Sequence, residues 1–305
     1  MIFQDSELNK LSRLFNQIIN ETYGLERESL DALSFIPPQA GIGQWLRTWT
    51  YKVLSEMGVA KLISDYAEDL PPVSRALELK TNDIREYGVS YGYSEFELMQ
   101  WLTAGIDLSR DEAETARRKI DEKVDEVLFV GDKDANTTGF LNNANVPMVI
   151  VPTGASGGTS IKGKTLLEII ATFQAMIDTV RNNTRRTVKA DTVLLPHDAF
   201  VYLSTTPKDE TGGDLTILEY LKKVFASQGL VNWKECAKLD EAGEGGTTRA
   251  VIYKYSPSVL TRCIPIPFKQ DEPQKKSLHY MVPCYARIGG VAFKNINAVA
   301  YADGL

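Results

Sequence analysis

The sequence predicts an α+β protein, and three observations lead to this fold class. Some segments repeat apolar residues at helical spacing, which is typical of amphipathic helices. Other segments alternate apolar and polar residues, which is typical of strands with one exposed face. The two kinds of segment follow one another in mixed order and without an internal repeat, which favours α+β over a regular α/β arrangement.

The composition limits the classes to which the chain can belong. Its 305 residues are 43% hydrophobic and 24% charged, as in a globular chain, and no run approaches the ~20 apolar residues of a membrane span. The 34 basic and 40 acidic residues give a net charge of −6, whereas a dedicated nucleic-acid binder normally has a basic excess. Residues 1–5 do not resemble a signal peptide, so we expect synthesis in a cytoplasm.

The residue types that carry chemistry form no recognisable site. Cys236, Cys263 and Cys284 fit no metal-ligand spacing, and we expect them to be reduced and buried. The carboxylates are scattered, and no spacing singles out a general acid and base. The sequence therefore predicts no catalytic residue, no cofactor and no metal ion.

The N-terminal region begins with an amphipathic helix over residues 6–22. Residues 26–43, with Pro37 and Pro38, have no clear period, which indicates an extended arm. We expect such an arm to pack on a neighbouring subunit, since a chain that folds alone seldom leaves 40 residues unpacked.

Residues 45–93 alternate between apolar and polar side chains, which predicts long strands. Turn residues at 56–58 and 81–83 are expected to separate them into hairpins. These hairpins have polar faces that suit no isolated core, and exposed hairpins invite pairing with other chains.

Capping boxes mark the starts of helices at residues 94–97, 109–112 and 165–168. The second box opens a long helix with a charged outer face and one narrow apolar stripe. The stripe consists of Ala113, Ala116, Ile120, Val124 and Val127. We expect this helix to lie across a sheet.

The remaining elements are shorter. We expect a buried strand over 146–151, strands over 192–195 and 249–255, and a helix over 216–225. His197 and Asp198 are expected to form a polar turn, and the last third alternates again from Ile264 to Tyr301.

A glycine-rich segment, residues 158–165, matches the phosphate-loop pattern, in which amides and a lysine surround phosphates and a hydroxyl holds magnesium. The matching residues are Gly158, Gly163, Lys164 and Thr165. The preceding strand is expected to end near Val151, too early for the pattern, and no downstream strand ends in an aspartate. Thr165 also has a local role as a helix N-cap paired with Glu168. We therefore favour a plain loop that leads into a helix, with a nucleotide-binding enzyme as the alternative.

Two other patterns have simple structural explanations. Residues 154–158 fit the nucleophile elbow around Ser156, but the helix that the elbow requires starts nine residues later, and the chain has only two histidines, His197 and His279. A basic cluster could meet phosphates, but it falls at a helix C-terminus, where cations are favoured anyway. Its members are Arg181, Arg185, Arg186 and Lys189.

The order of several segments resembles major capsid proteins of tailed bacteriophages with the HK97-like fold. The long charged helix is followed by Val-Leu-Phe-Val-Gly-Asp at 127–132 and Thr-Gly-Phe-Leu-Asn-Asn-Ala-Asn-Val at 138–146. Phe140 stands where that family has a leucine, and Ala144 where it has a proline. Further segments are similar to one subfamily of these proteins and occur in the same order, at residues 58–71, 217–221, 287–291 and 300–305. The resemblance covers about residues 45–305.

The resemblance implies a division of the chain into five parts. An N-terminal arm would span residues 1–36, and an extended E-loop with adjoining strands 37–93. A peripheral domain with a long spine helix would span 94–150, and an axial domain 151–284. C-terminal strands, residues 285–305, would return to the peripheral domain.

The function that the resemblance implies is structural. Copies of the chain would form hexamers and pentamers of an icosahedral head that encloses double-stranded DNA without reading its sequence. Scaffolding, portal and decoration proteins would be further partners. The protein would be a virion component assembled in the host cytoplasm, without membrane contact. Little precedes Asp5, so scaffolding would be separate or unnecessary. An encapsulin-type nanocompartment shell is the close alternative.

Overall fold

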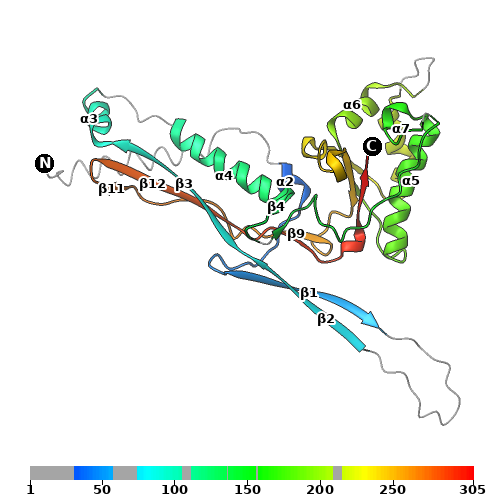
Figure 1. Cartoon of the computed structure of the whole chain (residues 1–305), viewed down its shortest axis with the longest axis horizontal. Helices are drawn as coiled ribbons and strands as arrows, with labels where there is room; N and C mark the ends of the chain where they lie inside the picture. The colour runs from blue at the N-terminus through cyan, green and yellow to red at the C-terminus, as the bar shows by residue number, and fades with distance from the viewer. Residues whose placement is uncertain (1–30, 58–73, 105–110, 136, 156, 209–214) are drawn as a thin grey trace, which may run out of the picture.

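The computed structural model describes residues 31–57, 74–104, 111–135, 137–155, 157–208 and 215–305. The molecule is elongated: a long sheet with one helix beside it occupies one end, a second sheet with several helices the other, and a two-stranded ribbon projects from the middle (Figure 1). Helices and strands are mixed along the chain, so the prediction of an α+β fold is confirmed.

The long sheet is built around β12, which pairs antiparallel with β3 over ten residues of each strand. The other edge of β12 pairs with two shorter strands. The strands are β3 (Arg85–Ser94), β10 (Ile266–Gln270), β11 (Gln274–Lys276) and β12 (His279–Ile288). Tyr91 and Tyr93 of β3 and Tyr280, Val282 and Cys284 of β12 are buried and alternate with more exposed residues, which leaves one face of this part of the sheet open.

Helix α4 (Asp111–Phe129) lies along this sheet, as Figure 1 shows. The predicted apolar stripe is buried, with Ala116, Ile120 and Val124 each no more than 4% exposed. The outer face carries ion pairs such as Lys119 with Glu122 (2.7 Å). The spine-like helix predicted from the sequence is therefore confirmed. Its predicted capping box at residues 109–112 includes positions outside the described residues.

The second sheet has the strand order β14-β8-β6-β7, in which only β6 and β7 are parallel. Its strands are β6 (Thr192–Leu195), β7 (Asn232–Glu235), β8 (Arg249–Tyr253) and β14 (Val299–Asp303). Its helices are α5 (Leu166–Asn183), α6 (His197–Thr205) and α7 (Ile217–Ala226). The helices gather at the end of the molecule that also holds the C-terminus (Figure 1).

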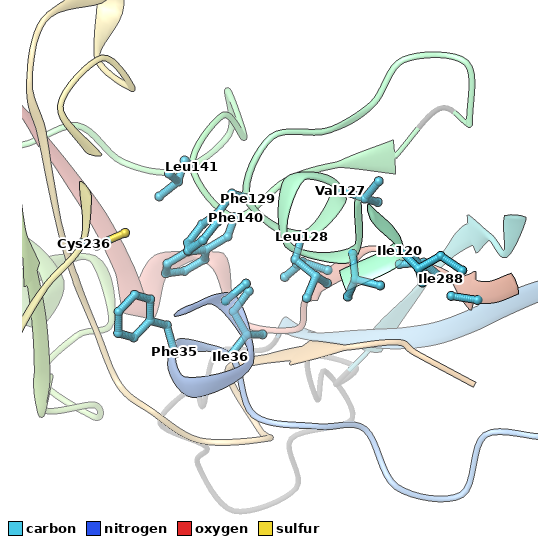
Figure 2. Packing of buried hydrophobic residues seen from close by; sticks show 14 of the residues in the cluster. Phe35, Ile36, Ile120, Val127, Leu128, Phe129, Phe140, Leu141, Cys236 and Ile288 are labelled. Carbon is cyan, nitrogen blue, oxygen red and sulfur yellow. The ribbon is translucent and has the colours of Figure 1, made fainter. Parts of the chain in front are cut away.

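Strands β6, β8 and β14 of this sheet are buried on both faces and separate two hydrophobic cores. Val193, Ala250 and Ile252 point into a core shared with α5 and α7. Their neighbours Leu194 and Val251 point to the opposite face, into the core that α4 and residues 140–141 share. The alternation follows from the strand period of two. Figure 2 shows part of the second of these cores.

The ribbon consists of β1 (Thr48–Met57) and β2 (Ser74–Asp83), paired from Thr48↔Asp83 to Met57↔Ser74. It confirms the predicted pair of long strands, and the residues between them lie outside the described part. The predicted turn at 81–83 is wrong, because β2 continues through Asp83 and only buried Ile84 separates it from β3. The expected turn at 56–58 also begins too early, since Met57 still belongs to β1.

The smaller elements complete the chain. They are α2 (Asp31–Phe35), α3 (Glu95–Ala104), β4 (Gly131–Asp132), β5 (Thr137–Thr138), β9 (Leu260–Arg262) and β13 (Val291–Phe293). Single 3₁₀ turns occur at Ile161–Gly163, Ala237–Leu239, Glu244–Gly246 and Ile296–Ala298. The predicted capping box of α3 forms in part, because the Ser94 amide donates to Glu97 Oε2 (2.8 Å).

Two predicted elements near the second sheet are wrong. Residues 146–151 form no strand, although Val149 and Pro147 hydrogen-bond to Tyr301 along the outer edge of β14. Pro147 has no amide to extend a ladder, and Ile150 is 91% exposed. The turn expected at His197 is the start of α6, which buries Ala199 and Leu203 one turn apart.

The expected division of the C-terminal third differs from the strand pairing at two points. β12 begins at His279, so residues 279–284 lie in the sheet beside α4 rather than with the second sheet. β14 pairs with β8, so the last strand returns to the second sheet and not to the sheet beside α4. Four of its five residues are buried, which matches a strand covered on both faces.

The described residues of the expected N-terminal arm do not pack only on a neighbouring subunit. Ala32, Phe35 and Ile36 are buried in the core of their own chain.

No helix within the described ranges is both long and apolar enough to cross a membrane.

Candidate functional site

The glycine-rich loop places Lys164 inside the protein. Lys164 is 6% exposed, and its Nζ lies 2.9 Å from Oγ1 of Thr172 on α5. Burial lowers the pKa of Lys164, and the nearby Glu168 carboxylate opposes that shift. Gly154 packs on the lysine stem, since a Cβ there would lie 2.9 Å from Lys164 Cγ. The ammonium group thus has a partner within its own chain.

Glu168 ties the loop to the start of α5. Its Oε2 accepts a hydrogen bond from the Thr165 amide (2.7 Å), and its Oε1 accepts one from the Ala155 amide (2.8 Å). These bonds lower the pKa of the Glu168 carboxyl, so an anionic group occupies the helix N-terminus. The predicted N-cap role of Thr165 is confirmed. Gly163 ends a 3₁₀ turn, and Gly158 has open space beside its Cα.

The residues of the possible nucleophile elbow are not brought into one site. Ser156 lies outside the described residues. His197, at the start of α6, contacts Glu235 at the end of β7 (2.5 Å between Nδ1 and Oε1), and the carboxylate raises the pKa of His197. His279 lies in the other sheet, opposite Ser94.

The three cysteines are free and buried, as predicted. Burial raises the pKa of each thiol to about 12, so the reactive thiolate form is disfavoured at neutral pH. Among the described residues no group of three or more histidine, cysteine, aspartate or glutamate side chains could hold a metal ion.

The residues of the basic cluster lie at the C-terminus of α5 and just after it, and two of them contact the turn after α7. Arg181 Nη2 donates to the carbonyl oxygen of Gln228 (3.2 Å), in the turn after α7. Lys189 packs against Gly229 in the same turn. Arg185 and Arg186 lie between Arg181 and Lys189 in the sequence and are exposed.

The β1–β2 ribbon exposes most of its described side chains. Leu79 is 58% exposed, and Thr50 and Thr81 form a cross-strand hydrogen bond (3.0 Å) on the surface. Two paired strands without a covering layer are marginal in water. The stability of the ribbon therefore depends on the contacts that its base makes with the rest of the chain.

The base of the ribbon is held by polar anchors from the C-terminal region. Arg287 is 2% exposed, and its guanidinium donates to the carbonyl oxygens of Gln44 and Leu46 and to Glu86. Asn82 Nδ2 donates to the carbonyl oxygens of Gly289 and Val291 (3.3 and 3.2 Å). No local sequence pattern indicates these anchors, because their partners are backbone atoms distant in sequence.

A second set of anchors holds α2 between α4 and the second sheet. Asp125 of α4 is 9% exposed and accepts a hydrogen bond from the Ala32 amide (3.1 Å). Tyr253 of β8 donates its hydroxyl to the carbonyl oxygen of Phe35 (2.7 Å), and Arg262 donates to those of Leu33 (2.5 Å) and Ile36. Phe35 and Ile36 lie against the aromatic core in Figure 2. Asp125 is one of many charged residues in α4, so no sequence pattern distinguishes it as a buried anchor.

Large apolar side chains are exposed at several places far from these anchors. Phe96 on α3 and Leu278 before β12 are 66% and 60% exposed, and the Glu95 amide donates to the Leu278 carbonyl oxygen. Trp45, at the base of the ribbon, is 68% exposed and lies beside Arg287 and Lys269. Exposed apolar groups near polar rims are typical of protein contact surfaces.

Comparison with protein families gives one match over most of the chain. The family model described as "Major capsid protein" matches residues 58–305. Comparison with curated protein sequences gives no match.

Several solved structures share the fold. The capsid of Myoviridae phage XM1 matches with a TM-score of 0.74 at 19% identity, over 92% of this chain and 94% of that chain. A virus-like particle from Pyrococcus furiosus matches with a TM-score of 0.57 at 12% identity, over 95% and 97%. The capsid of a native GTA particle matches with a TM-score of 0.58 at 11% identity, over 92% and 91%. At these identities the likeness concerns the fold alone.

Proposed function

Because this chain belongs to the major capsid protein family, we propose that its copies form hexamers and pentamers of an icosahedral phage head that encloses double-stranded DNA. The chain is a structural protein of the virion and has the HK97-like fold of phage capsids. The prediction of a capsid subunit without catalytic chemistry rests on that membership.

The projecting ribbon is the observation that best supports assembly. It is ten residues long on each strand, and its described side chains are mostly exposed. The hydrogen bonds from Arg287 and Asn82 attach its base to the rest of its own chain. A neighbouring copy would bury the exposed surface, and obligate interfaces commonly bury more than ~2,000 Å² in total.

The two ends of the molecule correspond to two proposed domains. The sheet of β3, β10, β11 and β12 with α3 and α4 would be the peripheral domain. The sheet of β6, β7, β8 and β14 with α5, α6 and α7 would be the axial domain around the capsomer centre. The ribbon would be the E-loop.

The role of a capsid subunit implies further partners, DNA first. A net charge of −6 suits a container that must later release its DNA, since like charges limit tight overall binding. Scaffolding, portal and decoration proteins would act on the assembled head, and assembly would take place in the host cytoplasm.

Electron microscopy of the expressed full-length chain tests the assembly. We expect closed shells or rings of uniform size, and particles isolated from infected cells should protect double-stranded DNA from nuclease. A monomer that stays dispersed at high concentration would contradict the proposal.

The two alternatives are not favoured. In a nanocompartment shell, particles would contain a co-purifying enzyme in place of DNA. In a nucleotide-binding enzyme, Lys164 would face a phosphate, but its Nζ contacts Thr172 and the Glu168 carboxylate lies at the loop.

A further inference from the structure

Helix α5 ends in an unusual way. The Arg186 amide donates to the Arg181 carbonyl oxygen (2.6 Å) and the Arg185 amide to that of Asn182 (3.1 Å), which is the bonding pattern of a Schellman motif. The residue after the C-cap of this motif has a left-handed backbone and is usually glycine. Here it is Arg185, with φ of 51°, and Arg186 follows with φ of 62°.

Two consecutive arginines in this conformation are unfavourable for the fold. The Cβ atom of an L-residue crowds the backbone in the left-handed region, and glycine avoids that strain. Strained residues persist where the surrounding structure holds them, and they concentrate at functional positions. Two arginines therefore occupy positions at which glycine would end the helix with less backbone strain.

The helix dipole explains only part of this arrangement. Cations near a helix C-terminus are favourable, and Arg181, which has helical geometry, already occupies that position and binds Gln228. The dipole does not require arginine at the strained positions 185 and 186, because a lysine or arginine in the last helical turn gives the same effect.

The surroundings leave these guanidinium groups available. Arg185, Arg186 and Lys189 are exposed, and none has an ion pair among the described residues. The carboxylates closest in sequence are engaged elsewhere: Asp178 accepts from Gln174 (2.9 Å), and Asp191 accepts from Thr192 (2.8 Å).

The neighbouring helix adds further positive charge. Gln228, in the turn after α7, accepts from Arg181 through its carbonyl oxygen and donates to Gln174 on α5 (2.8 Å), so the ends of α5 and α7 are joined. Lys222 and Lys223 are exposed in the last turns of α7. On a chain of net charge −6, this joined end is locally basic.

We propose that Arg185 and Arg186, with Lys189 beside them, bind the phosphate backbone of the double-stranded DNA inside the head. This proposal rests on the proposed function, since it requires that the shell encloses DNA. Arginine suits the role because its planar guanidinium can bind two phosphate oxygens at once. The contact would be independent of sequence and spaced once per subunit, which is compatible with later release of the DNA.

Salt dependence of DNA binding by the unassembled full-length chain tests the proposal. The logarithm of the binding constant for a short duplex falls linearly with the logarithm of salt concentration, by ~0.9 for each phosphate neutralised. Arg185→Gly should lower that slope by about 1, and Arg185→Gly with Arg186→Gly by about 2. The same glycine substitutions should raise the midpoint of thermal unfolding, because they relieve the left-handed strain.

These opposite effects separate binding from folding. Arg185→Lys with Arg186→Lys should keep most of the slope, since the charges remain. Arg118→Gln is the matched control: it removes one exposed arginine charge from α4, and it should leave the slope unchanged.

An unchanged slope in the double glycine variant would overturn the proposal, as would wild-type chain that does not bind the duplex. Loss of shells in that variant would also overturn it, because the cluster would then face a neighbouring subunit. Failure of the wild-type chain to form shells contradicts the proposed function itself. Normal shells with an unchanged slope contradict only this inference.

Discussion

At the scale of residues, the buried charged groups serve as structural anchors. Lys164, Asp125 and Arg287 are each less than a tenth exposed and each contacts a polar partner in its own chain. Burying a charge is unfavourable unless the charge is hydrogen-bonded. In an enzyme, buried charged groups of this kind would be candidates for catalytic residues. Here Asp125 and Arg287 bind mainly backbone atoms, and Lys164 binds the Thr172 hydroxyl on α5, so all three hold segments of the chain together.

Lys164→Met tests the interpretation of the glycine-rich loop. The methionine keeps the apolar stem that packs on Gly154 and removes a charge whose burial is unfavourable. We expect the free energy of unfolding to change by only about 1 kcal/mol, measured by urea denaturation. Equilibrium dialysis should detect no Mg-ATP binding to either protein. Binding to the wild type that Lys164→Met abolishes would contradict this interpretation, and Lys162→Met, in the exposed neighbour, is the control.

Asp125 is expected to make stability depend on pH. Burial raises the pKa of Asp125, and the hydrogen bond from Ala32 opposes that shift. A raised pKa in the folded state means that the stability contributed by the bound proton is complete below the usual value for aspartate, 3.8. That contribution is lost as the pH rises through the folded value. Asp125→Asn, which keeps the acceptor, should therefore gain stability over the wild type as the pH rises through this range.

Urea denaturation at several pH values measures this difference. Asp125→Ala leaves the Ala32 amide without its acceptor, and it should be about 1–3 kcal/mol less stable than Asp125→Asn. If the difference in free energy of unfolding between Asp125→Asn and the wild type stayed constant from pH 4 to pH 7, burial would not raise the pKa of Asp125.

At the scale of elements, the sequence predicted what depends on local pattern. The stripe of α4, the capping box of α5 and the strands of the ribbon follow from spacing alone, and all are present. Two predictions were wrong because contacts with distant residues decide the structure there: the strand over 146–151 and the turn at 81–83. Residues 147–149 bond to Tyr301, and Asn82 bonds to backbone near Gly289. No local pattern contains those contacts, which is also why the anchoring role of Arg287 could not be predicted.

Arg287→Met should loosen the base of the ribbon. It removes the hydrogen bonds that the part-buried carbonyl oxygens of Gln44 and Leu46 accept from the guanidinium, and each such loss costs about 1–3 kcal/mol. Hydrogen exchange should become faster around residues 44–50 and 80–84 and stay unchanged in α5. Arg85→Met, which removes an exposed pair with Asp83, should have little effect. Equal exchange in both variants would show that other contacts hold the base.

At the scale of the whole molecule, the two cores and the ribbon have different relations to stability. The cores on either side of the second sheet stabilise one subunit, whereas the ribbon contributes exposed surface. Substitutions on the ribbon should therefore separate assembly from folding. The buried polar anchors should affect both.

Leu79→Lys should reduce assembly without unfolding the subunit. Burying a leucine in an interface contributes about 1.5–3 kcal/mol, so its loss should lower shell formation about tenfold or more. Thermal unfolding of the unassembled chain should stay within a few degrees of the wild type, because Leu79 is 58% exposed. Shell yield by electron microscopy is the measurement, and Glu78→Gln on the neighbouring position is the control. Normal yield in Leu79→Lys would place this face of the ribbon outside the interface.

In an assembled shell the ribbon would act as a lever. Ten residues per strand at ~3.3 Å each give an arm of ~33 Å, which the bonds from Arg287 and Asn82 hold at its base. A rotation of ~5° at that base would move the far end by ~3 Å, given the same arm length. A handful of hydrogen bonds at one point would thus adjust the spacing and tilt of neighbouring copies, and with them the curvature of the shell.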